Sequence, residues 1–360
     1  MNKLFDGSDL VKTPMLLKSE FPTPAKGERF VADARAAIRR ILHGSDDRLL
    51  VIVGPCSIHD PAAALDYAAR LSRTRQDLQR DLEIVMRVYF EKPRSCLGWK
   101  GLIHDPWLDE THDMDAGLQI ARKLLLDVTS LHLPIATEFL NVASPHYLAD
   151  LVSWGAIGAR TTESQVHREM ASGLPCPVGF KNGTDGTLEA AINAIRSARS
   201  PHRFLDVDGH GQFIRRRTDG NKDGHLVLRG GKVPNFDARS VAAAREKLEA
   251  SALPPRVVID ASHGNSGKLH ENQSRVCASI GARIAAGDAH IAGVMIESNL
   301  VAGTQAVTRD RTLVHGQSIT DACIGWDETV DVLDRLAASV RLRRNAATAS
   351  TGRVFQPAAV

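Results

Sequence analysis

The chain alternates short, continuously apolar runs with longer segments of helical pattern, and this alternation continues for most of its length. The apolar runs lie at 49–53, 82–89, 134–138, 156–159, 176–180, 204–207, 256–260 and 290–296. Runs that are apolar at every position are typical of strands buried on both faces, as in parallel sheets covered by helices. We therefore predict an α/β protein with a (β/α)8 TIM barrel, because about eight such repeats favour a closed barrel over an open sheet.

Segments outside this repeat define the rest of the organisation. Residues 1–45 read as a polar N-terminal arm and a helix from about 25 to 42, which we expect to serve oligomer contacts or regulation. The catalytic barrel is expected over 46–344. Residues 345–360 are rich in Ala, Thr and Ser, and we expect them to form a flexible tail.

A β-hairpin is expected as an insertion in the barrel at about 209–229. Its strands would be 211–217 and 224–229, joined by a turn at Asp219-Gly220-Asn221. This prediction rests on the turn residues, since Asp-Gly between two strand-like runs is a strong hairpin signal.

Composition excludes several classes of function. Lys and Arg number 45 against 42 Asp and Glu, so any strong positive field must be local, which suits a small anionic substrate better than nucleic acid. The five cysteines are widely spaced and form no CxxC pair, which indicates a reducing compartment. The start lacks the apolar core of a secretion signal, and no apolar run approaches the ~18–20 residues that span a bilayer. We predict a cytoplasmic protein that binds neither nucleic acid nor membranes.

Four side chains of metal-ligand type follow apolar, strand-like runs that lie far apart in the chain. They are Cys56, His263, Glu297 and Asp321. Active sites of such barrels lie where the carboxyl ends of the strands meet, so these side chains are expected to converge. A thiolate, an imidazole and two carboxylates suit a divalent first-row metal (Mn, Fe, Co or Zn) better than Mg or Ca. His59 is a competing ligand, but it precedes the helix start at Asp60-Pro61 and is expected to cap that helix.

Cations occupy corresponding positions after other apolar runs. They are Arg87, Arg160, Lys181 and Arg229. One such residue alone is usually a surface ion pair, but several at one mouth would repel one another unless they bound an anion. The loop 91–96 adds cations and a hydroxyl suited to a second phosphate. The stretch 264–268 is superficially similar to a nucleotide phosphate loop, but Ser262 stands where its first glycine is required, so we reject a nucleoside triphosphate site.

Taken together, these segments resemble class I 3-deoxy-D-arabino-heptulosonate 7-phosphate (DAHP) synthases in their long, feedback-regulated form. The similar segments are 54–60, 92–94, 158–164, 179–186, 228–231 and 318–326. The resemblance implies a metal-dependent, aldol-type condensation of phosphoenolpyruvate with D-erythrose 4-phosphate, which gives DAHP and phosphate. This reaction is the first step of the shikimate pathway.

The resemblance also implies a role for each matching residue. The metal would be held by Cys56, His263, Glu297 and Asp321; the phosphate of phosphoenolpyruvate by Arg160, Lys181 and Arg229, with Arg87 and Lys92 near its carboxylate; and the aldose phosphate by Lys92, Pro93, Arg94 and Ser95. Lys92 or His263 would handle a proton, and the sequence does not choose between them. The family often has Thr in place of Ser95, so we expect modest changes in affinity at that position.

Two alternatives remain to be weighed against this reading. The 3-deoxy-manno-octulosonate 8-phosphate synthases share the barrel and the chemistry but use arabinose 5-phosphate. They typically carry Ala-Asn between the lysine and the arginine, where this chain has Pro93 alone. A barrel kept only as an amino-acid sensor is the non-catalytic alternative, but such a sensor should have lost metal or phosphate residues, and this sequence retains all of them.

The regulated forms also imply an aromatic amino-acid site and a dimer or tetramer. The effector residues would be Pro145, His146, Met170, Leu174, Pro175 and Phe204. His146 stands where Gln is common and Pro175 where a Ser favours phenylalanine, while Asp206 and Arg216 replace small or apolar residues. We therefore expect tyrosine slightly ahead of tryptophan as inhibitor, with phenylalanine last. The apolar arm residues Leu16 and Leu17 indicate packing between subunits.

Overall fold

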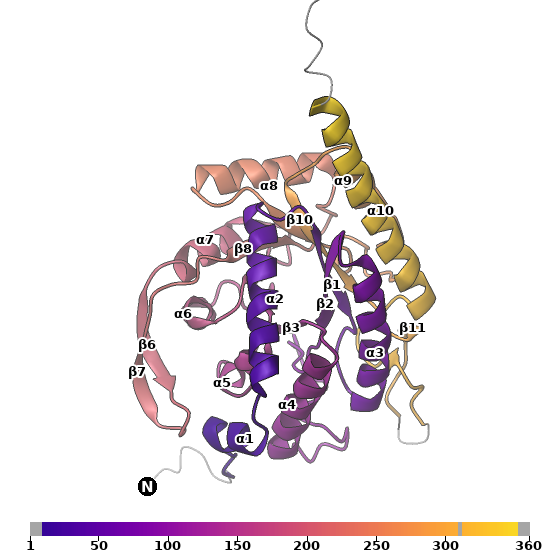
Figure 1. The fold of residues 1–360 in the computed structure, drawn as a ribbon. Helices are drawn as coiled ribbons and strands as arrows, with labels where there is room; N and C mark the ends of the chain where they lie inside the picture. The colour runs from indigo at the N-terminus through magenta and orange to yellow at the C-terminus, as the bar shows by residue number, and fades with distance from the viewer. Residues whose placement is uncertain (1–8, 309–311, 352–360) are drawn as a thin grey trace, which may run out of the picture.

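Eight parallel strands close a barrel in the computed structural model, which describes residues 9–308 and 312–351 (Figure 1). Around the barrel the strands follow the order β1 (Leu49–Gly54), β10 (Ile291–Glu297), β9 (Val257–Asp260), β8 (Gly224–Leu228), β5 (Val178–Lys181), β4 (Trp154–Ile157), β3 (Ile135–Glu138) and β2 (Leu82–Arg87). Every residue of these strands is buried. This explains why the runs are apolar throughout instead of alternating, and it confirms the predicted fold class.

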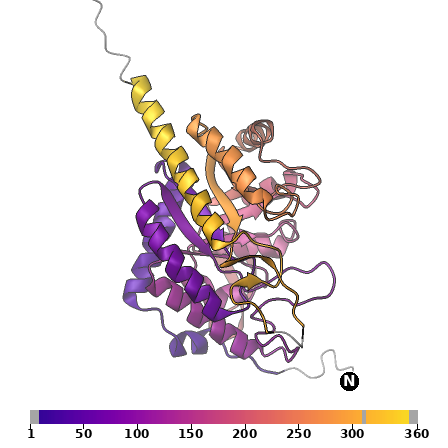
Figure 2. The same cartoon turned by 90° about the vertical axis from the view of Figure 1, so that its right-hand side faces the viewer.

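Helices cover the outside of the barrel, as Figures 1 and 2 show from two sides. They are α3 (Pro61–Leu78), α4 (Met114–Ser130), α5 (Ser144–Leu148), the 3-10 turn η1 (Ala149–Leu151), α6 (Gln165–Gly173), α7 (Glu189–Ala198), α8 (Ala238–Ala250), α9 (Asn272–Ala285) and α10 (Trp326–Thr351). Helix α3 begins as predicted, with Pro61 in its first turn. Its cap, however, is the Asp60 side chain, which accepts from the backbone N–H groups of Ala62 and Ala63, and not His59. No helix of the described residues is long and apolar enough to cross a membrane.

The N-terminal arm forms α1 (Pro14–Glu20) and α2 (Ala25–His43), and residues 1–8 lie outside the described part of the chain. Helix α2 lies across the barrel, and its apolar face, including Ile38 and Ile41, packs with side chains near the strand starts such as Leu50. This packing closes the N-terminal end of the barrel. The expectation for Leu17 is wrong: it is buried in the main core of its own chain, whereas Leu16 is exposed.

A hairpin is inserted between α7 and β8, but its strands differ from those predicted. The strands β6 (His202–Val207) and β7 (Phe213–Thr218) pair antiparallel, whereas 224–228 is the barrel strand β8 between β5 and β9. The physical reason is burial, since β8 is buried throughout, while β7 alternates between exposed and half-buried positions up to the buried Thr218 at its end. The Asp219-Gly220-Asn221 turn leads back into the barrel, where Asn221 Nδ2 donates to the carbonyl oxygen of Cys176 at 2.9 Å.

The C-terminal helix is longer than predicted. Residues 345–351, expected to belong to a flexible tail, continue α10, and 352–360 lie outside the described residues. Alanines in this stretch favour helix. Arg341 and Arg344 fix the preceding turn by ion pairs to Asp81, and Arg344 also pairs with Asp47. A short two-stranded sheet, β11 (Val301–Thr304) and β12 (Gln317–Ser318), precedes α10.

Candidate active site at the barrel mouth

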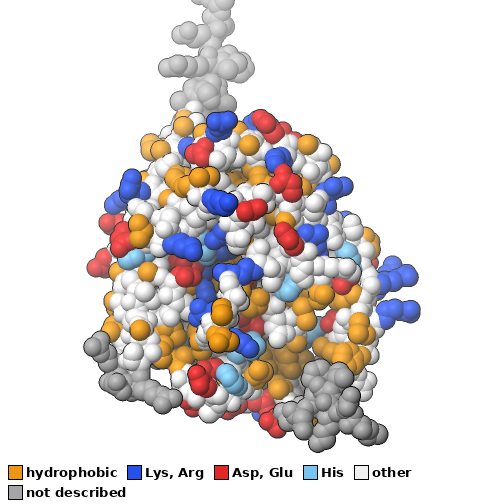
Figure 3. Space-filling view, turned by 180° about the vertical axis from the view of Figure 1, so that it is seen from behind, with side chains coloured by type: hydrophobic (Ala, Val, Ile, Leu, Met, Phe, Trp, Pro, Cys, Tyr) orange, Lys and Arg blue, Asp and Glu red, His pale blue; other side chains and the backbone are white. Residues whose placement is uncertain are grey.

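The carboxyl ends of the barrel strands surround one cavity of about 670 Å³. Seven cationic side chains line it, namely Lys92, Arg94, Arg160, Lys181, Arg229, Lys232 and Lys268, and the carboxylates that line it belong to Glu138, Glu297 and Asp321. Figure 3 shows lysine and arginine side chains around a central hollow on the face opposite to that of Figure 1. A concave, mainly cationic cavity of this size suits small, multiply charged anions.

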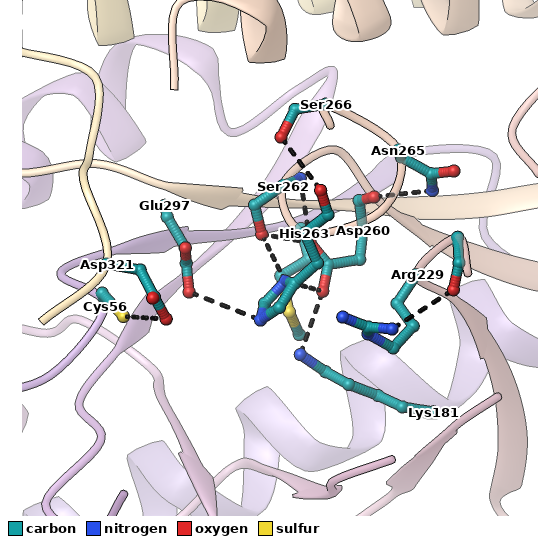
Figure 4. A network of polar contacts seen from close by, with 12 residues as sticks. Cys56, Lys181, Arg229, Asp260, Ser262, His263, Asn265, Ser266, Glu297 and Asp321 are labelled. Atoms are coloured by element: carbon teal, nitrogen blue, oxygen red, sulfur yellow. Dashed lines mark hydrogen bonds and ion pairs between the residues drawn. The ribbon is translucent and has the colours of Figure 1, made fainter. Parts of the chain in front are cut away.

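Three of the four predicted metal ligands come together at one side of this cavity (Figure 4). Cys56 follows β1, Glu297 ends β10 and Asp321 follows β12, and one ligand atom from each lies within 4.8 Å of the others. The Cys56 Sγ atom lies 3.4 Å from Asp321 Oδ2. His263 Nε2 lies 4.0 Å from Glu297 Oε1, so the fourth predicted ligand borders the group. These donors fit a divalent first-row metal.

Electrostatics around Cys56 also fit a bound cation. Burial, aided by the charge of Glu297, raises the pKa of the Cys56 thiol to about 12, although Lys92 opposes the shift. Lys92 Nζ lies 3.0 Å from Cys56 Sγ and 3.5 Å from Asp321 Oδ2. A thiol held protonated in this way needs nearby positive charge to become a thiolate, and a coordinated metal supplies it.

A buried carboxylate orients the neighbouring groups. Asp260, the last residue of β9, is fully buried and lies 2.9 Å from Lys181 Nζ and 3.0 Å from His263 Nδ1. Burial raises the pKa of Asp260, but the charges of Lys181 and His263 outweigh this effect and hold it well below its ordinary value. Because Nδ1 of His263 faces Asp260, its Nε2 is the nitrogen available toward Glu297 and a metal.

The predicted substrate residues differ in where they lie. Arg160 Nε donates to Ser95 Oγ at 3.2 Å. This hydrogen bond joins the two predicted phosphate-binding sites at the cavity wall. Arg87, in contrast, is buried behind the cavity lining, with an N–H group 3.0 Å from Glu297 Oε1 and its guanidinium over the Tyr89 ring. The structure therefore places Arg87 as a direct support of Glu297. Pro93 and Arg94 line the cavity as expected.

Three of the lining residues that sequence reasoning missed carry Lys or Glu side chains. Glu138 ends β3, and its Oε1 atom is buried without a hydrogen-bond partner among the described residues. Lys232 follows the Arg229-Gly230-Gly231 segment, and Lys268 ends the loop that was rejected as a nucleotide site. The position of Glu138 at a strand end could have identified it. The two lysines lie on loops, where sequence gives no direction for a side chain.

The predicted effector residues lie around the inner side of the hairpin. Pro145, Met170 and Leu174 are buried, Phe204 is half-buried on β6 and Pro175 is exposed. His146 on α5 reaches the hairpin, since its Nε2 lies 2.9 Å from Asp206 Oδ1.

Arg216 on β7 pairs with the other oxygen of Asp206 and donates to the carbonyl oxygen of Val207 at 2.9 Å. Three of the four residues that depart from the regulated pattern, His146, Asp206 and Arg216, therefore form one ionic cluster. This cluster connects both hairpin strands to α5.

Comparisons with known proteins agree with this geometry. The family model described as "DAHP synthetase I family" matches residues 23–334. The chain is 56% identical over 331 residues to the Phe-sensitive phospho-2-dehydro-3-deoxyheptonate aldolase of Escherichia coli K12, covering 92% of this chain and 95% of the relative. It is 55% identical over 332 residues to a Trp-sensitive form from Enterobacter agglomerans, with the same coverage. A solved phospho-2-dehydro-3-deoxyheptonate aldolase from Francisella tularensis SCHU S4 superposes with a TM-score of 0.92 at 47% identity, covering 94% of this chain and 99% of that one.

Proposed function

The chain belongs to the DAHP synthetase I family, and we propose that the cavity at its barrel mouth is where the family's reaction takes place. The activity is that of a 3-deoxy-7-phosphoheptulonate synthase, a transferase of aromatic amino acid biosynthesis. It condenses phosphoenolpyruvate with erythrose 4-phosphate and releases phosphate. The observation that carries the placement is that Cys56, Glu297 and Asp321 meet at the wall of a cavity that seven cations line.

In this proposal, one group of residues binds the anionic groups of phosphoenolpyruvate and a second group binds the phosphate of the aldose. Arg160, Lys181 and Arg229 bind the phosphate of phosphoenolpyruvate, and Lys92 binds its carboxylate. Arg87, buried behind Glu297, acts near this carboxylate through its charge and not by direct contact. The aldose phosphate lies against Lys92, Pro93, Arg94 and Ser95. The support for this division is that seven of these eight residues, all except Arg87, line the cavity beside the candidate metal ligands. Fixed cations offset the repulsion between two phosphorylated substrates and position their reacting carbons.

Enzymes of this family depend on a divalent metal, and we propose Mn, Fe, Co or Zn held by Cys56, His263, Glu297 and Asp321. When bound, such a metal supplies a Lewis acid that polarises the aldehyde carbonyl. The mixture of thiol, imidazole and carboxylate donors supports this choice over Mg or Ca.

The chain's own residues provide charge and relay protons for the bond changes. C3 of phosphoenolpyruvate bonds to the aldehyde carbon, the aldehyde oxygen takes a proton, and water adds at C2. The C2–O bond to phosphate then breaks as C2 becomes a ketone, and of the two protons from the water one replaces the proton given to the aldehyde oxygen and the other leaves on phosphate. We infer that Lys92 Nζ delivers the proton. His263 is less suited, because its Nδ1 is engaged by Asp260 and its Nε2 points toward the ligand group. Burial lowers the pKa of Lys92, but Cys56 and the nearby carboxylates outweigh this, so it stays protonated in the free enzyme.

Regulation and assembly complete the proposal. Relatives at 52–56% identity include Phe-sensitive and Trp-sensitive enzymes, so inhibition by an aromatic amino acid is expected here too. We propose tyrosine slightly ahead of tryptophan, with phenylalanine last, because His146, Asp206 and Arg216 place charges on the inner side of the hairpin. We also propose a cytoplasmic homodimer or homotetramer, with residues 1–45 contributing to regulation or assembly.

The decisive experiment measures phosphate release from phosphoenolpyruvate by metal-loaded protein, with erythrose 4-phosphate or arabinose 5-phosphate offered separately. Release with erythrose 4-phosphate alone, abolished by a chelator and in Cys56→Ala, is the expected result. Release only with arabinose 5-phosphate would assign the chain to the octulosonate branch. No release with either sugar would contradict the enzymatic assignment. The three aromatic amino acids are then tested as inhibitors at millimolar concentration.

A further inference from the structure

Two of the seven cavity cations, Lys232 and Lys268, have no part in the substrate roles proposed above. Both line the cavity, and both side chains are exposed. Within residues 9–308 and 312–351, neither ammonium group forms a hydrogen bond or an ion pair. Lys232 only contributes weakly to lowering the pKa of the exposed Asp185, whose main partner is Thr187. These two charges are therefore held at the cavity without a neutralising partner.

The two lysines lie on loops that touch each other. The Gly264 N–H group donates to the carbonyl oxygen of Arg229 at 3.0 Å, and a Cβ atom added at Gly264 would lie 2.7 Å from the nitrogen of Gly231. Lys268 closes its own loop by donating from its backbone N–H to the carbonyl oxygen of His263 at 2.8 Å. The loop contact holds Lys232 and Lys268 on the same side of the cavity as Arg229.

Charge balance distinguishes this pair from Lys92 and Lys181. Glu297 and Asp321 already have Arg87 and Lys92 as partners, and Lys181 is paired with Asp260. The loop lysines thus add positive potential to a cavity in which seven cations face three carboxylates, and neither lysine is paired with one of these carboxylates. Lysine is a point charge on a flexible stem, whereas the forked guanidinium of arginine fixes an oxyanion in one orientation. Exposed lysines suit brief capture of an anion better than its precise placement.

We propose that Lys232 and Lys268 form an outer phosphate-binding step at the cavity entrance. This step captures the phosphate of phosphoenolpyruvate before it reaches Arg160, Lys181 and Arg229, and holds inorganic phosphate as it leaves. The proposal rests on the proposed function for the identity of the anion. Its physical basis is a local positive field that raises the capture rate of an anionic substrate and weakens with salt.

The test compares the wild type with Lys232→Gln, Lys268→Gln and the double variant, and uses Lys123→Gln on the outside of α4 as the matched control. At low ionic strength the double variant should lose about three- to tenfold in kcat/KM for phosphoenolpyruvate, and the loss should shrink as salt is added. We expect kcat to change less than about twofold, because the pair contacts no reacting atom. The inhibition constant for inorganic phosphate should rise by a similar factor. The control should match the wild type.

Two results would overturn the outer step. One is an unchanged kcat/KM at low salt. The other is a loss confined to kcat and independent of salt, which would indicate distortion of the inner site. Calorimetric titration with inorganic phosphate separates this inference from the proposed function. If the wild type releases no phosphate from phosphoenolpyruvate, the function fails, while weaker phosphate binding by the double variant would still support the lysine pair, and equal binding would refute it.

Discussion

At the scale of single residues, Asp260 is the group on which the orientation of the mouth depends most. Its fully buried carboxylate holds Lys181 at 2.9 Å and His263 at 3.0 Å, and the hydroxyl of Ser262 donates to its other oxygen. The Lys181 side chain is itself only 5% exposed, so its ammonium depends on this single carboxylate for its charge balance. Removing one partner of such a pair leaves a buried charge uncompensated.

We therefore predict that Asp260→Asn lowers the free energy of unfolding by about 3–5 kcal/mol at neutral pH. Because the pKa of Asp260 is depressed in the folded state, its contribution is present above its unfolded value and is lost as pH falls through the folded pKa. Urea denaturation measures the change. The control is Asp331→Asn, which removes an exposed ion pair to Arg335 at 3.5 Å and should cost less than about 1 kcal/mol. Equal losses in the two variants would contradict the prediction.

A hydroxyl pair positions two of the proposed metal ligands. Ser57 Oγ and Thr320 Oγ1 lie 2.7 Å apart and join the residues next to Cys56 and Asp321. Thr320→Val keeps the shape and removes this hydrogen bond, so we predict about 10–100-fold weaker metal binding. Competition against a coloured chelator measures it, with Thr74→Val on α3 as control. Unchanged metal affinity in Thr320→Val would show that the loop is held by other contacts.

Much of the site could be predicted because its residues lie at the ends of strand-like runs in the sequence. Cys56, Glu297 and Asp321 were expected to converge because each follows or ends an apolar, strand-like run, and the structure brings them together. The sequence could not show that Arg87 lies behind Glu297, since the direction of a strand-end side chain depends on the barrel around it. Lys232 and Lys268 required the contact between two loops, which sequence spacing does not encode.

At the scale of elements, the hairpin shows where pattern reasoning failed. The Asp219-Gly220-Asn221 turn is real, but its flanking segments are a hairpin strand and a barrel strand, which do not pair with each other. Burial separates them: exposure alternates along β7, whereas β8 is buried at every position and apolar apart from His225. The same principle that predicted the barrel would have assigned β8 correctly, had it been given more weight than the turn signal.

Asp206 connects this hairpin to α5, and its removal should loosen the hairpin specifically. Burial raises the pKa of Asp206, but hydrogen bonds from Arg216 and the backbone, with the charge of His146, lower it overall. Asp206→Asn should lower the free energy of unfolding by about 1 kcal/mol, given the partial exposure of Arg216 and His146. The difference from wild type should be present above about pH 4 and shrink as pH falls below it.

Urea denaturation at several pH values measures this difference, and kcat should stay close to wild type because the hairpin lies outside the catalytic cavity. Aromatic amino acid inhibition should change in the same variant. Unaltered inhibition constants would remove the hairpin from the effector site.

At the scale of the whole molecule, the two ends of the barrel differ, and this difference explains why the candidate active site lies at only one of them. Helix α2 fills the end where the strands begin, and the opposite end keeps the cavity with its cations and carboxylates. The hairpin and α10 lie on different sides of the barrel in Figure 1. The outer face of the hairpin is exposed and carries Leu205 and Phe213, 75% and 78% exposed, beside three arginines.

That outer face has the composition of a contact surface. Arg203 lies opposite Arg217 across the hairpin, and Leu205 opposite Arg215, so like charges and apolar groups face solvent together. Like charges directly opposite destabilise a strand pair, and large exposed apolar side chains favour association.

We therefore predict that Phe213→Asp lowers the oligomeric state in sedimentation velocity, whereas Leu342→Asp, a similarly exposed apolar position on α10, leaves it unchanged. Both variants should retain the wild-type free energy of unfolding within about 0.5 kcal/mol under conditions where the protein is monomeric. An identical oligomer in wild type and Phe213→Asp would place the subunit contacts elsewhere and leave the hairpin's outer face to another partner.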